Sequence, residues 1–332
     1  MSTALLEILD QANERLAPES AIPAVHDLSR HLRDMRLELG HAAWRDAMRE
    51  ARAHPIARRL REDPLADRNL SRPRGYPGDA VALDFMYAGL PAAARQATTL
   101  LGRAIFAYTA GCSAAAVAVR QRRNALSLAI DETAAGVAGA RVLAVGCGHL
   151  REARLSRAVA AGSLGELVAV DSDRESLRVV ARDFAGPRVR TVAASVADLA
   201  WRRVPLGTFD LVYTAGLYER LGDVPARALT AALLRSLRPG GRLLISSFVD
   251  GFLSHEYMQA FMEWRLECRD EAGLRDLVGG VSRSARMAAR TWLDATRCLA
   301  WLEVRRPTRS AGLALAAAEA ADPIDERVRA SV

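Results

Sequence analysis

The sequence predicts an α/β protein in which an α-helical N-terminal cap precedes a Rossmann-like sheet of seven strands. Three observations support this prediction. Short apolar runs, such as 141–145 and 166–170, alternate with helix-compatible stretches in the second half of the chain. A Gly-Cys-Gly turn follows the first run and Asp171 ends the second, which is typical of a nucleoside-binding strand–helix–strand unit. Before these runs, apolar residues recur every three or four positions, as in amphipathic helices.

The N-terminal cap is predicted over residues 1–137. An apolar stripe with a charged opposite face follows Glu19, and packing helices extend to about residue 61. The stretch 68–89 is rich in Pro and Gly, which predicts a surface connector or a binding loop.

A further helix is predicted from 113 to about 132. Residues three and four apart lie on one face of a helix, so Arg120, Arg123 and Asn124 are expected to project together.

The nucleotide-binding domain is predicted over residues 138–307. Its fourth strand is expected at 209–216, and the segment 237–241 reads as a helix end and a turn before the fifth strand. A helical insertion at about 252–277 precedes two last strands near 288–293 and 299–304. The tail, residues 308–332, offers little to pack and is expected to be flexible.

The glycine turn narrows the class of nucleoside ligand. A dinucleotide site would need a third glycine for tight helix packing, but His149, Leu150 and Arg151 follow Gly148. S-adenosylmethionine (SAM) has a ribose and an adenine but no pyrophosphate, so one Gly-x-Gly turn and a distal acid suffice. On this segment alone, a tight turn in another α/β protein is the alternative reading.

Composition excludes several function classes. The formal charge is +7, but all 46 basic residues are Arg and are spread along the chain, so nucleic acid is not an expected partner. Because the chain has no Lys, it can neither form a lysine Schiff base nor supply the phosphate-binding lysine of a Walker motif. The four Cys form no C-x-x-C pair, so neither disulfides nor a metal site are expected. No signal peptide or membrane-spanning run is visible, which favours a cytoplasmic protein without a membrane partner.

The order of these segments resembles class I SAM-dependent methyltransferases. Within them, the loop Gly75-Tyr76-Pro77-Gly78-Asp79, the stretch 117–126 (VAVRQRRNAL) and the motif 146–152 (GCGHLRE) are similar to one bacterial family. These are the extracellular-factor (3-hydroxypalmitic acid methyl ester) biosynthesis methyltransferases. The resemblance spans about residues 68–307. Family members often have Pro-Ala at positions 149–150 and Gly-Asn at 246–247, where this chain has His-Leu and Ser-Ser. The substrate of this chain can therefore differ from that of the family.

The resemblance implies SAM as cofactor and a set of residues that bind it. Asp171 is assigned to the ribose hydroxyls, with Asp173 as the second choice. Ser195 and the backbone N–H of Val196 are assigned to the adenine. Arg120 or Arg123, with Asp79 and Tyr76, would bind the methionyl carboxylate and ammonium. The remaining residues assigned to the cofactor are Gly146, Cys147, Gly148, Ser172 and Thr214.

The expected reaction is O-methylation of the carboxylate of a small or fatty (3-hydroxyacyl) acid. A carboxylate is ionised at neutral pH, so the site needs only a donor that fixes one oxygen while the other attacks. Tyr213, Tyr218 and Arg269 are candidates for this donor. An acyl chain would be lined by Tyr257, Phe261 and Trp264, whose spacing equally fits an ordinary core stripe. His149 and His255 are candidate bases, although a lone His near a loop is more often structural.

Two other functions stay open at this point. In a SAM cyclase that forms azetidine-2-carboxylate and methylthioadenosine, Tyr76, Tyr218 and Trp264 would clamp the amino-acid part of SAM. Asp79 or Tyr218 would then help to remove an ammonium proton. In a non-catalytic SAM-binding module, Asp171 would be retained but no ordered second pocket would be needed.

Overall fold

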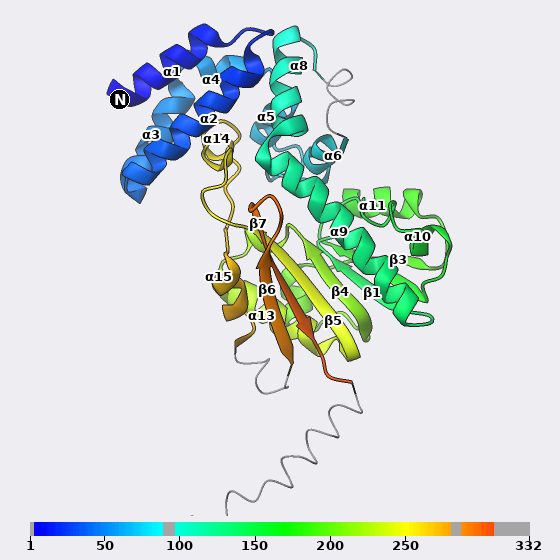
Figure 1. Ribbon diagram of the computed structural model, residues 1–332. Helices are drawn as coiled ribbons and strands as arrows, with labels where there is room; N and C mark the ends of the chain where they lie inside the picture. The colour runs from blue at the N-terminus through cyan, green and yellow to red at the C-terminus, as the bar shows by residue number, and fades with distance from the viewer. Residues whose placement is uncertain (1–2, 89–96, 280–286, 309–332) are drawn as a thin grey trace, which may run out of the picture.

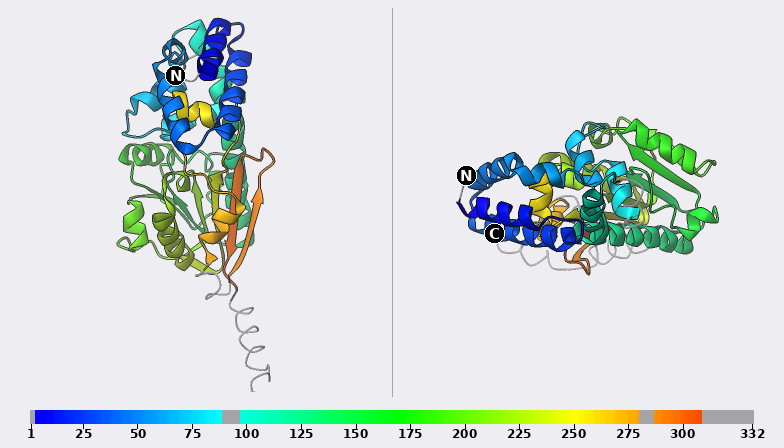
Figure 2. Two further views of the ribbon diagram at one scale, coloured as in Figure 1. Left: turned by 90° about the vertical axis from the view of Figure 1, so that its left-hand side faces the viewer. Right: turned by 90° about the horizontal axis from the view of Figure 1, so that it is seen from above.

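The computed structural model describes residues 3–88, 97–279 and 287–308. A helical layer lies across one edge of a twisted sheet, and the left view in Figure 2 shows the helical part stacked on the end of the sheet. The predicted fold, a seven-stranded Rossmann-like sheet with a helical N-terminal cap, is confirmed. The predicted tail beyond Thr308 lies outside the residues that the structure describes.

The helices before the sheet form the cap, at the top of Figure 1. Several begin with side chains that accept a backbone N–H, such as Asp63 before α5 and Ser113 before α9. The last helix, α9, leaves the cap and runs down one face of the sheet. The cap helices are α1 (Thr3–Arg15), α2 (Ala21–Glu38), α3 (His41–Ala53), α4 (Pro55–Leu60), α5 (Pro64–Ser71), α6 (Ala80–Ala88), α8 (Leu100–Phe106), the π-helical η1 (Ala107–Cys112) and α9 (Ala114–Gly136).

The sheet has the strand order β3-β2-β1-β4-β5-β7-β6. Strands β3 to β5 are parallel, and β7 is antiparallel to both of its neighbours. The elements are β1 (Arg141–Val145), α10 (Arg157–Ala160), β2 (Glu166–Asp171), α11 (Arg174–Asp183), β3 (Val189–Ala193), α12 (Val196–Ala200), β4 (Phe209–Ala215), η2 (Tyr218–Arg220), α13 (Asp223–Arg235), β5 (Leu237–Phe248), α14 (His255–Phe261), α15 (Glu271–Asp276), β6 (Ala288–Leu293) and β7 (Leu299–Arg305).

The strand β5 begins earlier than the sequence indicates. Leu237 already pairs with Phe209, and the register then shifts so that Leu211 pairs with Arg242. The segment Pro239–Gly241 is therefore an irregularity inside the strand, with Gly240 at φ +81°, rather than a turn that precedes it.

Alternating residues of the strands build two cores. In β1, Val142 and Ala144 face α9 and the cap helices, whereas Leu143 and Val145 face the side covered by α13. The insertion after β5 contributes to the first core, because α14 packs against α2 and α3. Trp44 of α3 donates to Oε1 of Gln259 in α14 at 3.0 Å, so the insertion after β5 packs with the N-terminal helices of the cap.

In the part of the chain that the structure describes, no single helix has both the length and the apolar composition to cross a membrane. The pair 100–112 and 114–136, bent by 46°, passes that test only when taken together.

Candidate functional site

The glycine turn after β1 lies beside the end of β2. Gly146 and Gly148 have φ values of +65° and +50°, which favour glycine. The N–H groups of Gly146 and Cys147 donate to the Val170 carbonyl at 2.8 and 3.1 Å. The Gly148 N–H donates to Asp171 Oδ2 at 2.8 Å, so this carboxylate is held against the turn. Parallel strands bring both features to one edge, as the sequence predicts.

The cap covers this edge directly. A Cβ added to Gly148 would lie 3.3 Å from the Cβ of Ala80, at the start of α6. Arg74 donates to Asp173 Oδ2 at 2.6 Å and lies 3.3 Å from His149 Nε2. The loop 75–79 is therefore fixed over the glycine turn.

Tyr76 belongs to this loop and packs against Arg220. The Arg220 guanidinium stacks 4.0 Å from the centre of its ring and donates to the Gly78 carbonyl at 2.6 Å. Burial raises the pKa of Tyr76, while Arg220 lowers it and the carboxylates of Asp173 and Asp171 raise it further. The phenol is therefore a neutral donor near the acidic end of β2.

The carboxylate of Asp79 makes its hydrogen bonds within the cap. It is buried, accepts two hydrogen bonds from Arg68 at 2.8 and 2.6 Å, and caps α6 through the N–H groups of Val81 and Ala82. Burial raises its pKa, but these hydrogen bonds outweigh it and leave the pKa below its ordinary value. Its side chain therefore fixes the loop to α5 and α6.

The two arginines expected at the methionyl end also have other partners. Arg120 donates to the carbonyls of Met86, Ala110 and Gly111, which ties α9 to the cap. Arg123 lies over the Tyr87 ring, 5.1 Å from its centre.

Arg122 is the arginine of α9 that faces the sheet. It is 2% exposed and donates to Oε1 of buried Glu219 at 2.9 Å. The spacing of α9 holds a signal that could have found it, because Arg122 falls on the buried stripe that contains Val119 and Leu126.

A second buried carboxylate, Glu152, follows the glycine turn. It accepts a hydrogen bond from the Tyr213 hydroxyl at 2.7 Å, and burial raises its pKa. Burial also raises the pKa of Tyr213, as does the carboxylate of Glu152. The phenol of Tyr213 therefore keeps its proton and donates a hydrogen bond to Glu152 near the ends of β1 and β4.

Tyr218 and Arg269 lie away from these groups. Tyr218 belongs to the core on the α13 side, where its hydroxyl lies 2.7 Å from Thr230 Oγ1. Arg269 donates to the carbonyls of Tyr218 and Leu221 and pairs with Asp223. Both residues therefore shape the segment after β4 and do not line the space under the cap.

The remaining residues assigned to a cofactor sit at the same edge. Ser195 closes a capping box with Asp198 at the start of α12, which places Val196 in the first turn after β3. Ser172 is exposed beside Asp171, and the Thr214 hydroxyl is buried at the end of β4 without a hydrogen-bond partner.

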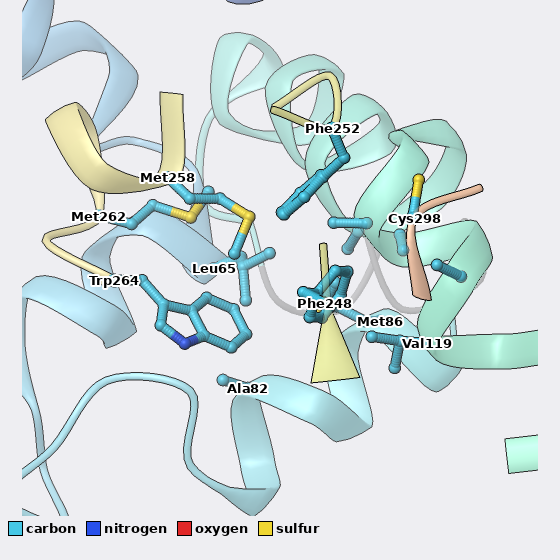
Figure 3. Packing of buried hydrophobic residues seen from close by; sticks show 14 of the residues in the cluster. Leu65, Ala82, Met86, Val119, Phe248, Phe252, Met258, Met262, Trp264 and Cys298 are labelled. Atoms are coloured by element: carbon cyan, nitrogen blue, oxygen red, sulfur yellow. The ribbon is translucent and has the colours of Figure 1, made fainter. Parts of the chain in front are cut away.

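An apolar cavity lies between the cap and the insertion. Figure 3 shows Trp264 beside Leu65, Met258 and Met262, with Phe248 at the end of β5 close by. Tyr257 also lines this cavity, and its buried hydroxyl has no hydrogen-bond partner. Phe261 instead packs on the Tyr257 ring, with centres 5.4 Å apart. A larger hollow of about 530 Å³ opens at the opposite edge of the sheet and contains none of these residues.

Residues 142–241 match the model of a methyltransferase domain. The matched segment begins in β1 and ends in β5, so it contains the glycine turn, Asp171 and the end of β4. This chain carries a SAM-dependent methyltransferase domain. S-adenosylmethionine is its cofactor, and the prediction of a class I methyltransferase domain is confirmed.

Solved structures are similar to this chain to different extents. A possible exported protein from Bordetella parapertussis is 17% identical, with a TM-score of 0.56 over 92% of this chain and 97% of that one. The N-methyltransferase NodS from Bradyrhizobium japonicum WM9, in complex with S-adenosylhomocysteine, is 16% identical, with a TM-score of 0.41 over 57% and 88%. Magnesium protoporphyrin IX methyltransferase from Synechocystis PCC 6803, with bound SAM, is 17% identical, with a TM-score of 0.43 over 58% and 81%. Among curated proteins, none matches the chain in sequence.

Proposed function

We propose that this methyltransferase transfers the methyl group of SAM to the carboxylate of an apolar acid, small or fatty. The single observation that carries the acceptor class is the small apolar cavity between the cap and the insertion, lined by Trp264, Met258 and Met262 and by the unpartnered hydroxyl of Tyr257. A site with mostly apolar walls and few polar groups suits an acyl chain that carries an oxygen.

The residues at the glycine turn suit the cofactor. A Cβ at Gly146 would lie 3.0 Å from the Leu217 side chain, so a larger residue at this position would press on Leu217 and only glycine fits. Asp171 supplies a carboxylate for two ribose hydroxyls at the same edge, and the backbone N–H of Val196 lies at the end of β3 for the adenine ring.

SAM supplies an electrophilic methyl group, so an ionised carboxylate oxygen can accept it without a general base, and the thioether leaves with the electrons of the C–S bond. The chain's own residues then need to position the acceptor and exclude water. Trp264 contributes to both, because its ring lies against Gly78 of the loop over the turn. Burial keeps the pKa of Tyr257 well above its ordinary value, so its hydroxyl stays protonated and donates to an acceptor oxygen.

The cavity is narrow in this arrangement, about 10 Å³. Methionine side chains rearrange easily because three rotatable bonds separate the thioether from the backbone. We therefore infer that an acyl chain enters as Met86, Met258 and Met262 change rotamer, and that the cavity enlarges with its occupant.

The test is an assay of the purified protein with SAM and a panel of apolar carboxylic acids, amines and alcohols of matched chain length. We expect S-adenosylhomocysteine and methyl ester to appear in equal amounts with the acids. Asp171→Ala should bind SAM at least about tenfold more weakly, because it loses hydrogen bonds to a charged group. Tyr257→Phe should raise KM for the acid and leave kcat nearly unchanged, whereas Tyr108→Phe, which alters the same cavity at a less buried hydroxyl, serves as control.

Methyl transfer to amines or alcohols but not to acids would overturn the proposed acceptor. Steady, enzyme-dependent methylthioadenosine from SAM alone would replace methyl transfer by cyclisation. Binding of SAM with no turnover of any kind would favour the non-catalytic module.

A further inference from the structure

Three side chains with different metal-binding atoms converge where the insertion after β5 begins and ends. Asp250 follows β5, His255 is the first residue of α14, and Cys268 lies between α14 and α15. One ligand atom of each residue, a carboxylate oxygen, an imidazole nitrogen or a thiol sulfur, lies within 4.8 Å of the other two. Two ligands of one tetrahedral zinc ion lie about 3–4 Å apart, so small side-chain movements bring all three to one ion.

His255 contributes a buried atom without a hydrogen-bond partner to this cluster. The residue is 3% exposed, and its Nδ1 lies 3.0 Å from Asp250 Oδ1 but makes no hydrogen bond. The other ring nitrogen, Nε2, lies 3.9 Å from Cys268 Sγ. A buried nitrogen without a partner is costly, and a bound ion would remove that cost.

We propose that Asp250, His255 and Cys268 bind a zinc ion. Zinc accepts oxygen, nitrogen and sulfur ligands together, whereas Mg²⁺ and Ca²⁺ prefer oxygen alone. On binding, the Cys268 thiol releases its proton to solvent, so one carboxylate and one thiolate balance the two charges of the ion. The Asp250 side chain is 72% exposed, so the ion can arrive from solvent, and a water molecule completes four-fold coordination.

The cap orients the His255 ring from its other side. The side-chain amide nitrogen of Gln259 lies 2.8 Å from Nε2, and the amide oxygen accepts from Trp44 of α3. Outer partners of this kind fix the orientation of a histidine ligand. An amide has both a donor and an acceptor, so Gln259 can bond to the ring whichever nitrogen carries the proton.

A zinc ion at this place would join the two ends of the insertion. The Arg269 N–H already donates to the Phe248 carbonyl at 2.9 Å, so the ends lie side by side. Closing the loop with an ion restricts the chain between its ligands. The metal site does not depend on the proposed acceptor, but its effect on the acceptor cavity does. The loop supplies five residues that line this cavity, Ser254, Tyr257, Met258, Met262 and Trp264.

Zinc titration of the chelator-treated protein, followed by calorimetry, tests the site. We expect Cys268→Ser and His255→Gln to weaken zinc by at least about tenfold, because even an outer partner of a ligand is commonly worth that much. Cys112→Ser removes an exposed thiol outside the cluster and should bind zinc as the wild type does. With Co²⁺ as the probe, the wild type should show a thiolate-to-cobalt charge-transfer band, and Cys268→Ser should lack it.

Two measurements on the wild type keep the test independent of how the variants fold. Zinc should slow the alkylation of Cys268 by N-ethylmaleimide, followed by peptide mass spectrometry, and leave the exposed Cys112 unaffected. Zinc should also slow hydrogen exchange in the segment 250–268.

Zinc binding that survives both Cys268→Ser and His255→Gln unchanged would be adventitious and would overturn the inference. A wild-type protein that binds no zinc would do the same, as would equal alkylation of Cys268 with and without zinc. A protein that passes these tests but forms no methyl ester would refute the proposed acceptor and leave the metal site in place.

Discussion

Asp63 is a buried acid in the cap with an unusual protonation equilibrium. It is 0% exposed, and its oxygens accept from the Leu65 N–H and the Thr109 hydroxyl, each at 2.9 Å. Burial outweighs these bonds and raises its pKa from 3.8 to about 7. At pH 6 the native state therefore holds a proton that the unfolded chain has released.

The stability of the protein should consequently fall as the pH rises through this window. Because the native state binds the extra proton between about pH 4 and 7, the free energy of unfolding decreases with pH there, by on the order of 4 kcal/mol in total. Asp63→Asn should remove this decrease and be the more stable form at pH 8. Urea unfolding of both proteins from pH 5 to 8 measures it, with Asp67→Asn as an exposed control. Parallel pH profiles for wild type and Asp63→Asn would contradict the prediction.

Single residues also set the limit of what the sequence predicts. The glycine turn and Asp171 could be placed at one edge because consecutive parallel strands share that edge. The arginine that faces it could not be chosen by counting basic residues. Arg120 and Arg123 share a face of α9, but that face meets the carbonyls at the end of α6, whereas Arg122 meets Glu219 of η2 and Phe248 of β5. A side chain's partner depends on which element packs opposite it, and that is a tertiary property.

At the scale of elements, the loop 72–79 connects the cap with both the sheet and the insertion. Arg74 joins it to Asp173 after β2, and Gly78 lies against Trp264, which follows α14. From its Pro and Gly content, the sequence predicts that this loop is a surface connector or a binding loop. The cyclase alternative brings Trp264 near Tyr76 of this loop only through a shared ligand. No local pattern predicts the direct contact of Trp264 with Gly78, because the two positions are far apart in the sequence.

Alanine variants at two glycines of the loop provide a matched test of the packing against Trp264. Gly75 and Gly78 both have positive φ values, +85° and +67°, so alanine at either costs roughly 1–2 kcal/mol of backbone strain. A Cβ at Gly78 would also lie 2.4 Å from the Trp264 ring, whereas a Cβ at Gly75 meets nothing within 4 Å. Gly78→Ala should therefore reduce methyl transfer by about tenfold or more, while Gly75→Ala changes mainly stability. Equal turnover of the two variants, measured alongside urea unfolding, would show that Trp264 does not shape the site.

For the whole molecule, a chain of ion pairs holds the cap on the sheet. Asp84 of α6 accepts two hydrogen bonds from Arg151, at 2.7 and 2.6 Å, and lies 2.8 Å from His149 Nδ1. Arg151 also bonds to Asp183, which belongs to the sheet domain itself. Burial raises the pKa of Asp84, but its bonds to Arg151 and His149 bring the pKa below its ordinary value, so the Asp84 carboxylate is ionised at neutral pH.

This chain of ion pairs predicts that cap closure and cofactor affinity are coupled. If SAM binds under a closed cap, the apparent Kd rises in proportion as the closed fraction falls. Asp84→Asn removes one of the charges that join cap and sheet, so hydrogen exchange of the segment 72–88 should accelerate and SAM should bind several-fold more weakly. Asp183→Asn alters the same arginine within the sheet domain, so it should reduce stability without selectively accelerating exchange in that segment. Hydrogen exchange measured by mass spectrometry with and without SAM decides the matter. SAM should slow exchange in 72–88 in the wild type, and an Asp84→Asn protein with wild-type exchange there would show that the cap is held by other contacts.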